Sequence, residues 1–176
     1  MKKPKEKIKK IHSLRHQITA YFIGLLFLSI LTITVINGAF LEKYYVTKKI
    51  DVLLNLRTTL ENTDIDKMMN SNSSKGMESI PDEIQRACSR NNLSWVIIDS
   101  SNTSWLSWGE NEKMLQSKLF GYVYDLDEDG DKSRTLKQGD NYTIQQSHDR
   151  FAGMDYVECW GQLDEEHYFI IRTPLE

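Results

Sequence analysis

The chain contains one long stretch without an acidic, lysine or arginine side chain, from His16 to Leu41. Within it, residues 18–41 form a run of 24 residues dominated by isoleucine, leucine, phenylalanine and valine. Because an α-helix rises about 1.5 Å per residue, roughly 20 residues cross a hydrocarbon core of about 30 Å. The run therefore predicts a transmembrane helix over 18–41, with the two flanking parts of the chain on opposite sides of a membrane.

The charge of the chain changes sign across this run. Residues 1–17 carry seven lysine or arginine side chains and one glutamate, a net charge of +6. The whole chain carries −3, so the remaining residues carry −9. Because positive charge is enriched on the cytoplasmic side of membrane proteins, we expect 1–17 to be a basic cytoplasmic tail and residues from about 42 to be extracytoplasmic. The predicted location is the cell membrane, with a single pass.

Two other interpretations of the N-terminus are less consistent with the sequence. A cleaved signal peptide has an apolar core of about 7–15 residues and a small-x-small cleavage site, whereas this run is longer and its best candidate site begins with Asn37. A nucleic-acid-binding tail would interleave cations with aromatic rings for base stacking, but no aromatic residue precedes Tyr21. The expected partner of the tail is the lipid bilayer, not nucleic acid.

Apolar residues continue at helical spacing after the membrane run. They predict a membrane-proximal helix over 42–69 that continues the transmembrane helix, and they include Val46, Ile50, Leu53, Leu54 and Leu60. So narrow an apolar stripe needs a partner, and two alternatives are open. The stripe either packs on the domain that follows or pairs with a second copy in a homodimer, where Arg57 would interrupt the seam of a coiled coil.

The remaining residues, 70–176, alternate between strand-like and helix-like patterns. Residues 70–79 and 125–140 are polar and read as loops. Helices are expected from Pro81 to about residue 91 and over 111–124, and strands over 93–99, 103–108, 141–147, 156–163 and 168–173. The fold class predicted for this part is α+β, with a mainly antiparallel five-stranded sheet and flanking helices.

This order of elements resembles the extracytoplasmic PAS-like or Cache sensor domains. The segment WVIIDSSN at 95–102 is similar to the strand and turn that open a Cache sheet, and YFIIRTPLE at 168–176 to the last sensor strand. Residues 13–45 resemble the N-terminal anchor of Gram-positive two-component sensor histidine kinases. The resemblance implies an input region that transmits a stimulus across the membrane by helix displacement, and a cytoplasmic response regulator reached only through a kinase core.

The sequence contains no recognisable motif of that kinase core. His12, His16, His148 and His167 all lack the context of a phosphoacceptor histidine, and no glycine-rich nucleotide loop is present. We therefore expect no enzymatic activity and no cofactor for this chain, which reads best as the input part of a larger kinase. The alternative is a stand-alone, membrane-anchored module that binds another envelope protein.

The stimulus of such a domain is either a small ligand or an envelope protein, and aromatic and charged residues are the candidates for contacting it. For each aromatic ring the ordinary core is the favoured explanation, and Asp99 is explained equally well as the start of an Asx-turn. A further charged candidate is Glu158. The candidate ligand-binding residues are Trp95, Asp99, Trp105, Trp108, Tyr124, Tyr142, Trp160 and Arg172.

Metal binding and disulfide formation complete the candidate chemistry. Asp125, Asp127 and Asp129 alternate as in the start of an EF-hand loop, but the twelfth position, which needs a glutamate, holds Leu136. We therefore expect a solvated acidic loop and no metal site. Cys88 and Cys159 both fall on expected apolar faces, where a disulfide or two buried free thiols would fit, and the thiols are favoured.

Overall fold

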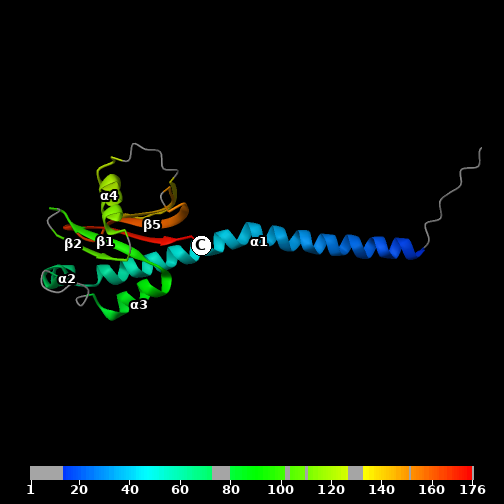
Figure 1. Ribbon diagram of the computed structural model, residues 1–176, viewed down its shortest axis with the longest axis horizontal. Helices are drawn as coiled ribbons and strands as arrows, with labels where there is room; N and C mark the ends of the chain where they lie inside the picture. The colour runs from blue at the N-terminus through cyan, green and yellow to red at the C-terminus, as the bar shows by residue number, and fades with distance from the viewer. Residues whose placement is uncertain are drawn as a thin grey trace, which may run out of the picture. The chain divides into compact units, whose positions relative to one another are not determined.

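The computed structural model describes residues 14–72, 80–101, 104–109, 111–126, 133–150 and 152–175 (Figure 1). The chain divides into two compact units, Met1–Lys43 and Tyr44–Glu176. Residues 1–13 of the expected basic tail and 73–79 of the expected loop at 70–79 lie outside the described residues.

Helix α1, Leu14–Glu61, includes the whole apolar run predicted to form a helix. Its most apolar window buries none of its residues, and the helix is long and apolar enough to cross a membrane. Hydroxyl groups within the run donate to carbonyls one turn earlier, for example Thr32 Oγ1 to Leu28 O at 2.8 Å and Thr34 Oγ1 to Ile30 O at 2.9 Å. These bonds satisfy groups that would be costly in lipid.

The helix expected over 42–69 is divided in two. Helix α1 ends at Glu61, and a short helix α2, Ile65–Asn72, follows. Asp64 stands directly before α2, and its carboxylate accepts the backbone N–H of Lys67 at 3.1 Å. An aspartate in this position satisfies an N–H group that a helix start leaves without an intrahelical partner. The polar residues 62–64 therefore interrupt the expected helix, and a new helix begins at Ile65.

The other elements follow in the predicted order, with one addition. They are α3 Asp82–Asn91, β1 Ser94–Asp99, β2 Trp105–Trp108, α4 Glu112–Val123, β3 Arg134–Gln138, β4 Tyr142–Asp149, β5 Met154–Gln162 and β6 His167–Pro174. They build one sheet in the order β2-β1-β6-β5-β4-β3, with every neighbouring pair antiparallel.

The sheet has six strands, so the predicted count of five was wrong. The additional strand is β3, which lies within the stretch 125–140 that was expected to be a loop. Its sequence RTLKQ is polar because β3 is an edge strand with four of its five residues exposed. Its pairing with β4 also shifts register between Thr135 and Lys137. A polar, irregular edge strand lacks the apolar alternation that marks a strand in sequence.

Helices cover both faces of the sheet (Figure 1). On one face, Leu53, Leu56 and Leu60 of α1 join a core that includes residues of α2, α3 and the strands. On the other face, Leu115 and Leu119 of α4 pack on Val96, Ile98 and Ile170. The apolar stripe of α1 therefore packs on its own domain, which is the first of the two alternatives. Pairing with a second copy remains a prediction.

Candidate functional site

The α4 side of the sheet contains a group of buried polar side chains. Strands β4, β5 and β6 direct them to this side by the alternation of their residues. Charged residues are rarely buried unless they are paired. The α4 side of the sheet therefore differs from an ordinary apolar core. The members of this group are Gln145, Ser147, Asp149, Glu158 and Arg172, each 6 % exposed or less.

Glu158 is fully buried and is held by two residues of α4. Lys118 Nζ lies 3.0 Å from Glu158 Oε1, and the Tyr122 hydroxyl donates to Glu158 Oε2 at 2.8 Å. The Tyr122 ring also stacks on Trp160 with ring centroids 5.0 Å apart. These contacts fasten the middle of α4 to β5.

Arg172 and Asp149 form a second buried pair. Arg172 Nη1 lies 3.1 Å from Asp149 Oδ2, and the two side chains are 4 % and 3 % exposed. The guanidinium carbon lies 3.9 Å from the ring centroid of Tyr156, a cation–π geometry. Asp149 Oδ1 also accepts the backbone N–H of Ala152 at 3.0 Å, in the turn between β4 and β5. Two strands and a turn thus fix the position of the Arg172 guanidinium.

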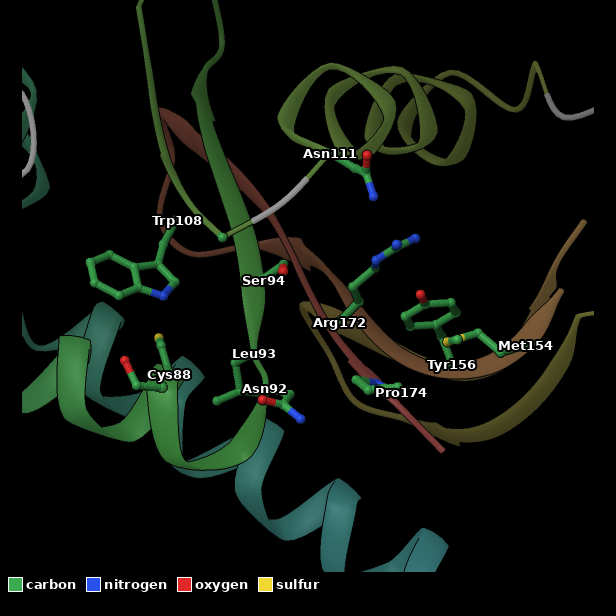
Figure 2. A pocket seen from close by; sticks show the side chains of 12 residues that line it. Cys88, Asn92, Leu93, Ser94, Trp108, Asn111, Met154, Tyr156, Arg172 and Pro174 are labelled. Carbon is green, nitrogen blue, oxygen red and sulfur yellow. The ribbon is translucent and has the colours of Figure 1, made fainter. Parts of the chain in front are cut away.

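A cleft of about 460 Å³ lies beside this arginine. Figure 2 shows the Arg172 side chain extending toward Asn111, with Tyr156 and Met154 at its side. Among the described residues, Asp149 supplies the only oxygen that accepts a hydrogen bond from the guanidinium, and Met114 Sδ lies 3.9 Å from the same Nη1. The cleft is lined by Cys88, Ser89, Asn92, Leu93, Ser94, Trp108, Gly109, Asn111, Met154, Tyr156, Arg172 and Pro174.

The N-terminus of α4 opens onto the same cleft. Asn111 precedes the helix with φ 61°, and its side chain makes no capping hydrogen bond. The backbone N–H groups of a first helical turn carry partial positive charge, which here adds to the charge of Arg172. Gly109 has φ 91°, and a Cβ atom there would lie 2.9 Å from Ser94 Cβ, so glycine is required at this wall of the cleft. The cleft is therefore suited to a small anion.

The structure brings together two of the eight candidate ligand-binding residues, Trp108 and Arg172, at this cleft. Trp95 is fully buried in the core on the α1 side. Asp99 accepts the Ser104 hydroxyl at 2.8 Å, at the other end of β1. The other candidates are dispersed.

Those dispersed candidates are all aromatic. Tyr142 packs against the core on the α1 side, and Trp160 on the α4 side. Trp105 is 48 % exposed and donates its indole N–H to Glu112. Tyr124 is 58 % exposed and stacks on Phe120. None of these four lines the cleft at Arg172.

Sequence reasoning did not identify Asn111 and Asp149 as parts of a site, and Tyr156, one of the aromatic residues that could line a pocket, was not among the eight candidates. The segment 148–150 was expected to be a hairpin turn, but His148 and Asp149 are the last residues of β4, and the turn begins only at Arg150. A signal was nevertheless present in β4, whose sequence YTIQQSHD places Thr143, Gln145 and Ser147 two residues apart. Polar residues at alternate positions of a central strand indicate a polar face.

The expectations about metal and thiol chemistry concern other parts of the domain. Asp125 is exposed, and Asp127 and Asp129 lie outside the described residues. No three His, Cys, Asp or Glu side chains of the described part are grouped to hold a metal ion. Cys88 and Cys159 are buried free thiols, as favoured. Burial raises the pKa of Cys88 to about 11 and that of Cys159 to about 12, so neither forms a reactive thiolate at neutral pH.

No protein-family model matches this chain, and no curated protein or solved structure matches it either. The resemblance to sensor kinases therefore rests on the sequence patterns alone, and the arguments for function rest on the geometry of the cleft and the helices around it.

Proposed function

We propose that this chain is the membrane-anchored, extracytoplasmic sensory input region of a two-component sensor histidine kinase. In this proposal α1 crosses the membrane with the basic tail 1–17 in the cytoplasm, and the domain after residue 42 senses the stimulus outside. The proposal is supported by the long apolar helix, by the charge difference across it and by the cleft at Arg172.

The observation that carries the proposal is a link from the cleft to α1 through two adjacent residues of β6. Arg172 faces the cleft, and Thr173, fully buried, faces the opposite side of the sheet. The Thr173 hydroxyl accepts a hydrogen bond from Lys49 Nζ of α1 at 3.1 Å and donates to Asn91 O of α3 at 3.0 Å. A ligand that moves this end of β6 will therefore displace α1.

The partial burial of Lys49 makes its hydrogen bond to Thr173 sensitive to small displacements. Burial, together with the neighbouring charge of Lys48, lowers the pKa of Lys49. A partly buried ammonium needs its hydrogen-bond partner more than an exposed one does. Movement of Thr173 away from Lys49 therefore favours a new position of the lysine and of the helix that carries it.

The cleft favours a small organic anion as the ligand. Arg172 and the first turn of α4 supply positive charge, and Leu93, Trp108 and Pro174 supply apolar surface. A planar guanidinium with free N–H donors binds a carboxylate through two parallel hydrogen bonds. To act as a signal, the ligand must prefer one arrangement of β6 and α1 over the other, because equal affinity for both arrangements shifts nothing.

Ligand binding is tested by thermal unfolding of the full chain in lipid nanodiscs against a panel of small carboxylates, phosphates and uncharged analogues. We expect one anionic compound to stabilise the domain by about 2.7 kcal/mol at a hundred times its Kd. Arg172→Lys should remove this response, because lysine keeps the charge but lacks the planar donors. Arg86→Gln, at the exposed ion pair with Asp82, is the control and should respond as the native chain does.

Two results would contradict ligand binding at this site. One is a panel in which no compound, charged or neutral, changes the unfolding temperature. The other is an Arg172→Lys variant with the same response as Arg86→Gln. The first result would favour a domain that binds another envelope protein.

Coupling to α1 is tested by spin labels at Asn55→Cys on α1 and Lys137→Cys on β3, both exposed positions. The stabilising compound should change the distance between the labels in the native background. Lys49→Met should abolish the change while the compound still raises the unfolding temperature, because the bond to Thr173 is lost. Lys48→Met, one residue earlier and exposed, should keep the change. Equal behaviour of the two lysine variants would exclude this route.

A further inference from the structure

A buried histidine connects α2 to the opposite end of β6. His167 is 4 % exposed and lies between two carboxylates from different elements. Its Nδ1 is 2.9 Å from both oxygens of Asp164, in the turn between β5 and β6. Its Nε2 is 3.6 Å from Oδ1 of Asp66, on α2. The imidazole thus lies between the carboxylate of the turn and the carboxylate of α2.

The contacts of Asp164 determine which imidazole nitrogen carries hydrogen. The Asp164 carboxylate also accepts the backbone N–H groups of Glu166 and His167, each at 2.9 Å. Partial burial raises the pKa of Asp164, but the hydrogen bonds from His167 and the backbone outweigh it, so the pKa is lowered. Asp164 is therefore an ionised acceptor, and Nδ1 is the donor to it. In the neutral imidazole, Nε2 then presents a lone pair to the Asp66 carboxylate.

We propose that His167 is a proton-operated latch that fastens α2 to the sheet. In the neutral imidazole, Nε2 and Asp66 Oδ1 are both hydrogen-bond acceptors and repel each other. When Nε2 takes a proton from solvent, it becomes an N–H donor directed at Asp66 Oδ1, and the imidazolium and the carboxylate form an ion pair. The imidazolium is then bonded to the turn through Nδ1 and to α2 through Nε2. Loss of the proton restores the repulsion and releases α2.

Charged groups from several elements surround the imidazole. From α2 and the residue before it come Asp64, Asp66 and Lys67, and Asp64 is already paired with Lys67 at 2.5 Å. The turn contributes Asp164, Glu165 and Glu166, and β1 contributes Asp99, the cross-strand partner of His167. At the end of α1, Glu61 is paired with Arg57. Carboxylates near an imidazole stabilise its charged form.

Helix α2 is suited to being fastened and released. It has 8 residues, and its known apolar anchors to the core are Ile65 and Met68, with Met69 packed against the same core. Short elements with few buried contacts open at low free-energy cost. Because α2 follows α1 after residues 62–64, the latch acts directly on the end of α1, and histidine side chains change charge between about pH 5 and 8.

The latch is tested by hydrogen–deuterium exchange of the α2 amides in the full chain, at pH 5.5 and 7.5, with correction for intrinsic exchange. We expect α2 to be about tenfold more protected at the lower pH, because the charge-assisted bond from Nε2 to Asp66 forms only with the protonated imidazole. His167→Gln and Asp66→Asn should both remove the difference. Asp66 is 72 % exposed, so its variant keeps the fold if the His167 variant does not.

The matched control is His148→Gln. His148 Nδ1 pairs with Asp155 Oδ1 at 2.6 Å, but this pair is exposed and lies within one hairpin, so the variant should keep the full pH response of α2. The proposal is overturned if native α2 shows equal protection at both pH values, or if Asp66→Asn leaves the response unchanged. The measurement uses no ligand, so its outcome is independent of the cleft at Arg172.

Discussion

Replacing Lys118 by methionine will lower the free energy of unfolding by about 3–5 kcal/mol, the cost of leaving one member of a buried ion pair without its partner. Glu158 is fully buried, and Lys118 is the cation that pairs with it, at 3.0 Å. Methionine is nearly as long as lysine but carries no charge, so among the described residues Glu158 is left with the Tyr122 hydroxyl as its partner. Urea unfolding of the full chain in mild detergent, followed by tryptophan fluorescence, measures the change.

Two further variants separate the buried pair from general effects on α4. Lys113→Met changes an exposed lysine of the same helix and should alter the free energy of unfolding by less than about 0.5 kcal/mol. The double variant Lys118→Met with Glu158→Leu should recover most of the loss, since apolar residues often replace a buried ion pair without cost. Equal effects of Lys118→Met and Lys113→Met would show that the ion pair between Lys118 and Glu158 does not contribute to the free energy of unfolding.

Most elements of the domain were predictable from local sequence. Strands β1 and β6 contain the runs WVII and YFII, which are β-branched and aromatic as buried strands require. Helix α3 follows directly after Pro81, a residue compatible with a helix start but not with a helix interior. The edge strand β3 was not predictable, because its exposed, polar residues are what both a loop and a protected edge display.

The candidate site was predictable only in part, because burial of an aromatic ring depends on what covers it. Trp95 and Trp108 are cross-strand partners on the same side of the sheet. The first is fully buried in the core, and the second lies at the rim and lines the cleft. Nothing near either residue in sequence distinguishes them. Arg172 was identifiable because a charge within an apolar strand must be paired or functional.

Arg57 shows how the structure resolves an ambiguity in the sequence pattern. In sequence it interrupts the apolar stripe of α1. In the domain its guanidinium carbon lies 4.9 Å from the ring centroid of Tyr142 and 6.0 Å from that of Phe169, and its side chain pairs with Glu61. The aromatic rings stabilise the cation, so the apolar stripe packs on the sheet with the arginine included in the interface.

Replacing Leu53 by alanine will lower the free energy of unfolding of the domain by about 2–5 kcal/mol, as expected for a large-to-small change in a packed core. Leu53 is fully buried, although it belongs to the helix that contains the exposed apolar run. Urea unfolding measures the loss. Asn55→Ala, an exposed change on the same helix, is the control and should cost less than about 0.5 kcal/mol.

A small effect of Leu53→Ala, similar to that of Asn55→Ala, would mean that α1 is not part of the folded core. For the proposed sensory function, the distinction decides how a stimulus would reach the N-terminal part of α1. Because Leu53, Leu56 and Leu60 are core residues, α1 cannot leave the sheet without unfolding the domain. In the proposed function, a stimulus can therefore move α1 only by small shifts within its packed interface with the sheet. The bond between Lys49 and Thr173 lies at one end of that interface, and α2 with its histidine follows the other end. Both are therefore placed to bias the same helix while its apolar contacts stay intact.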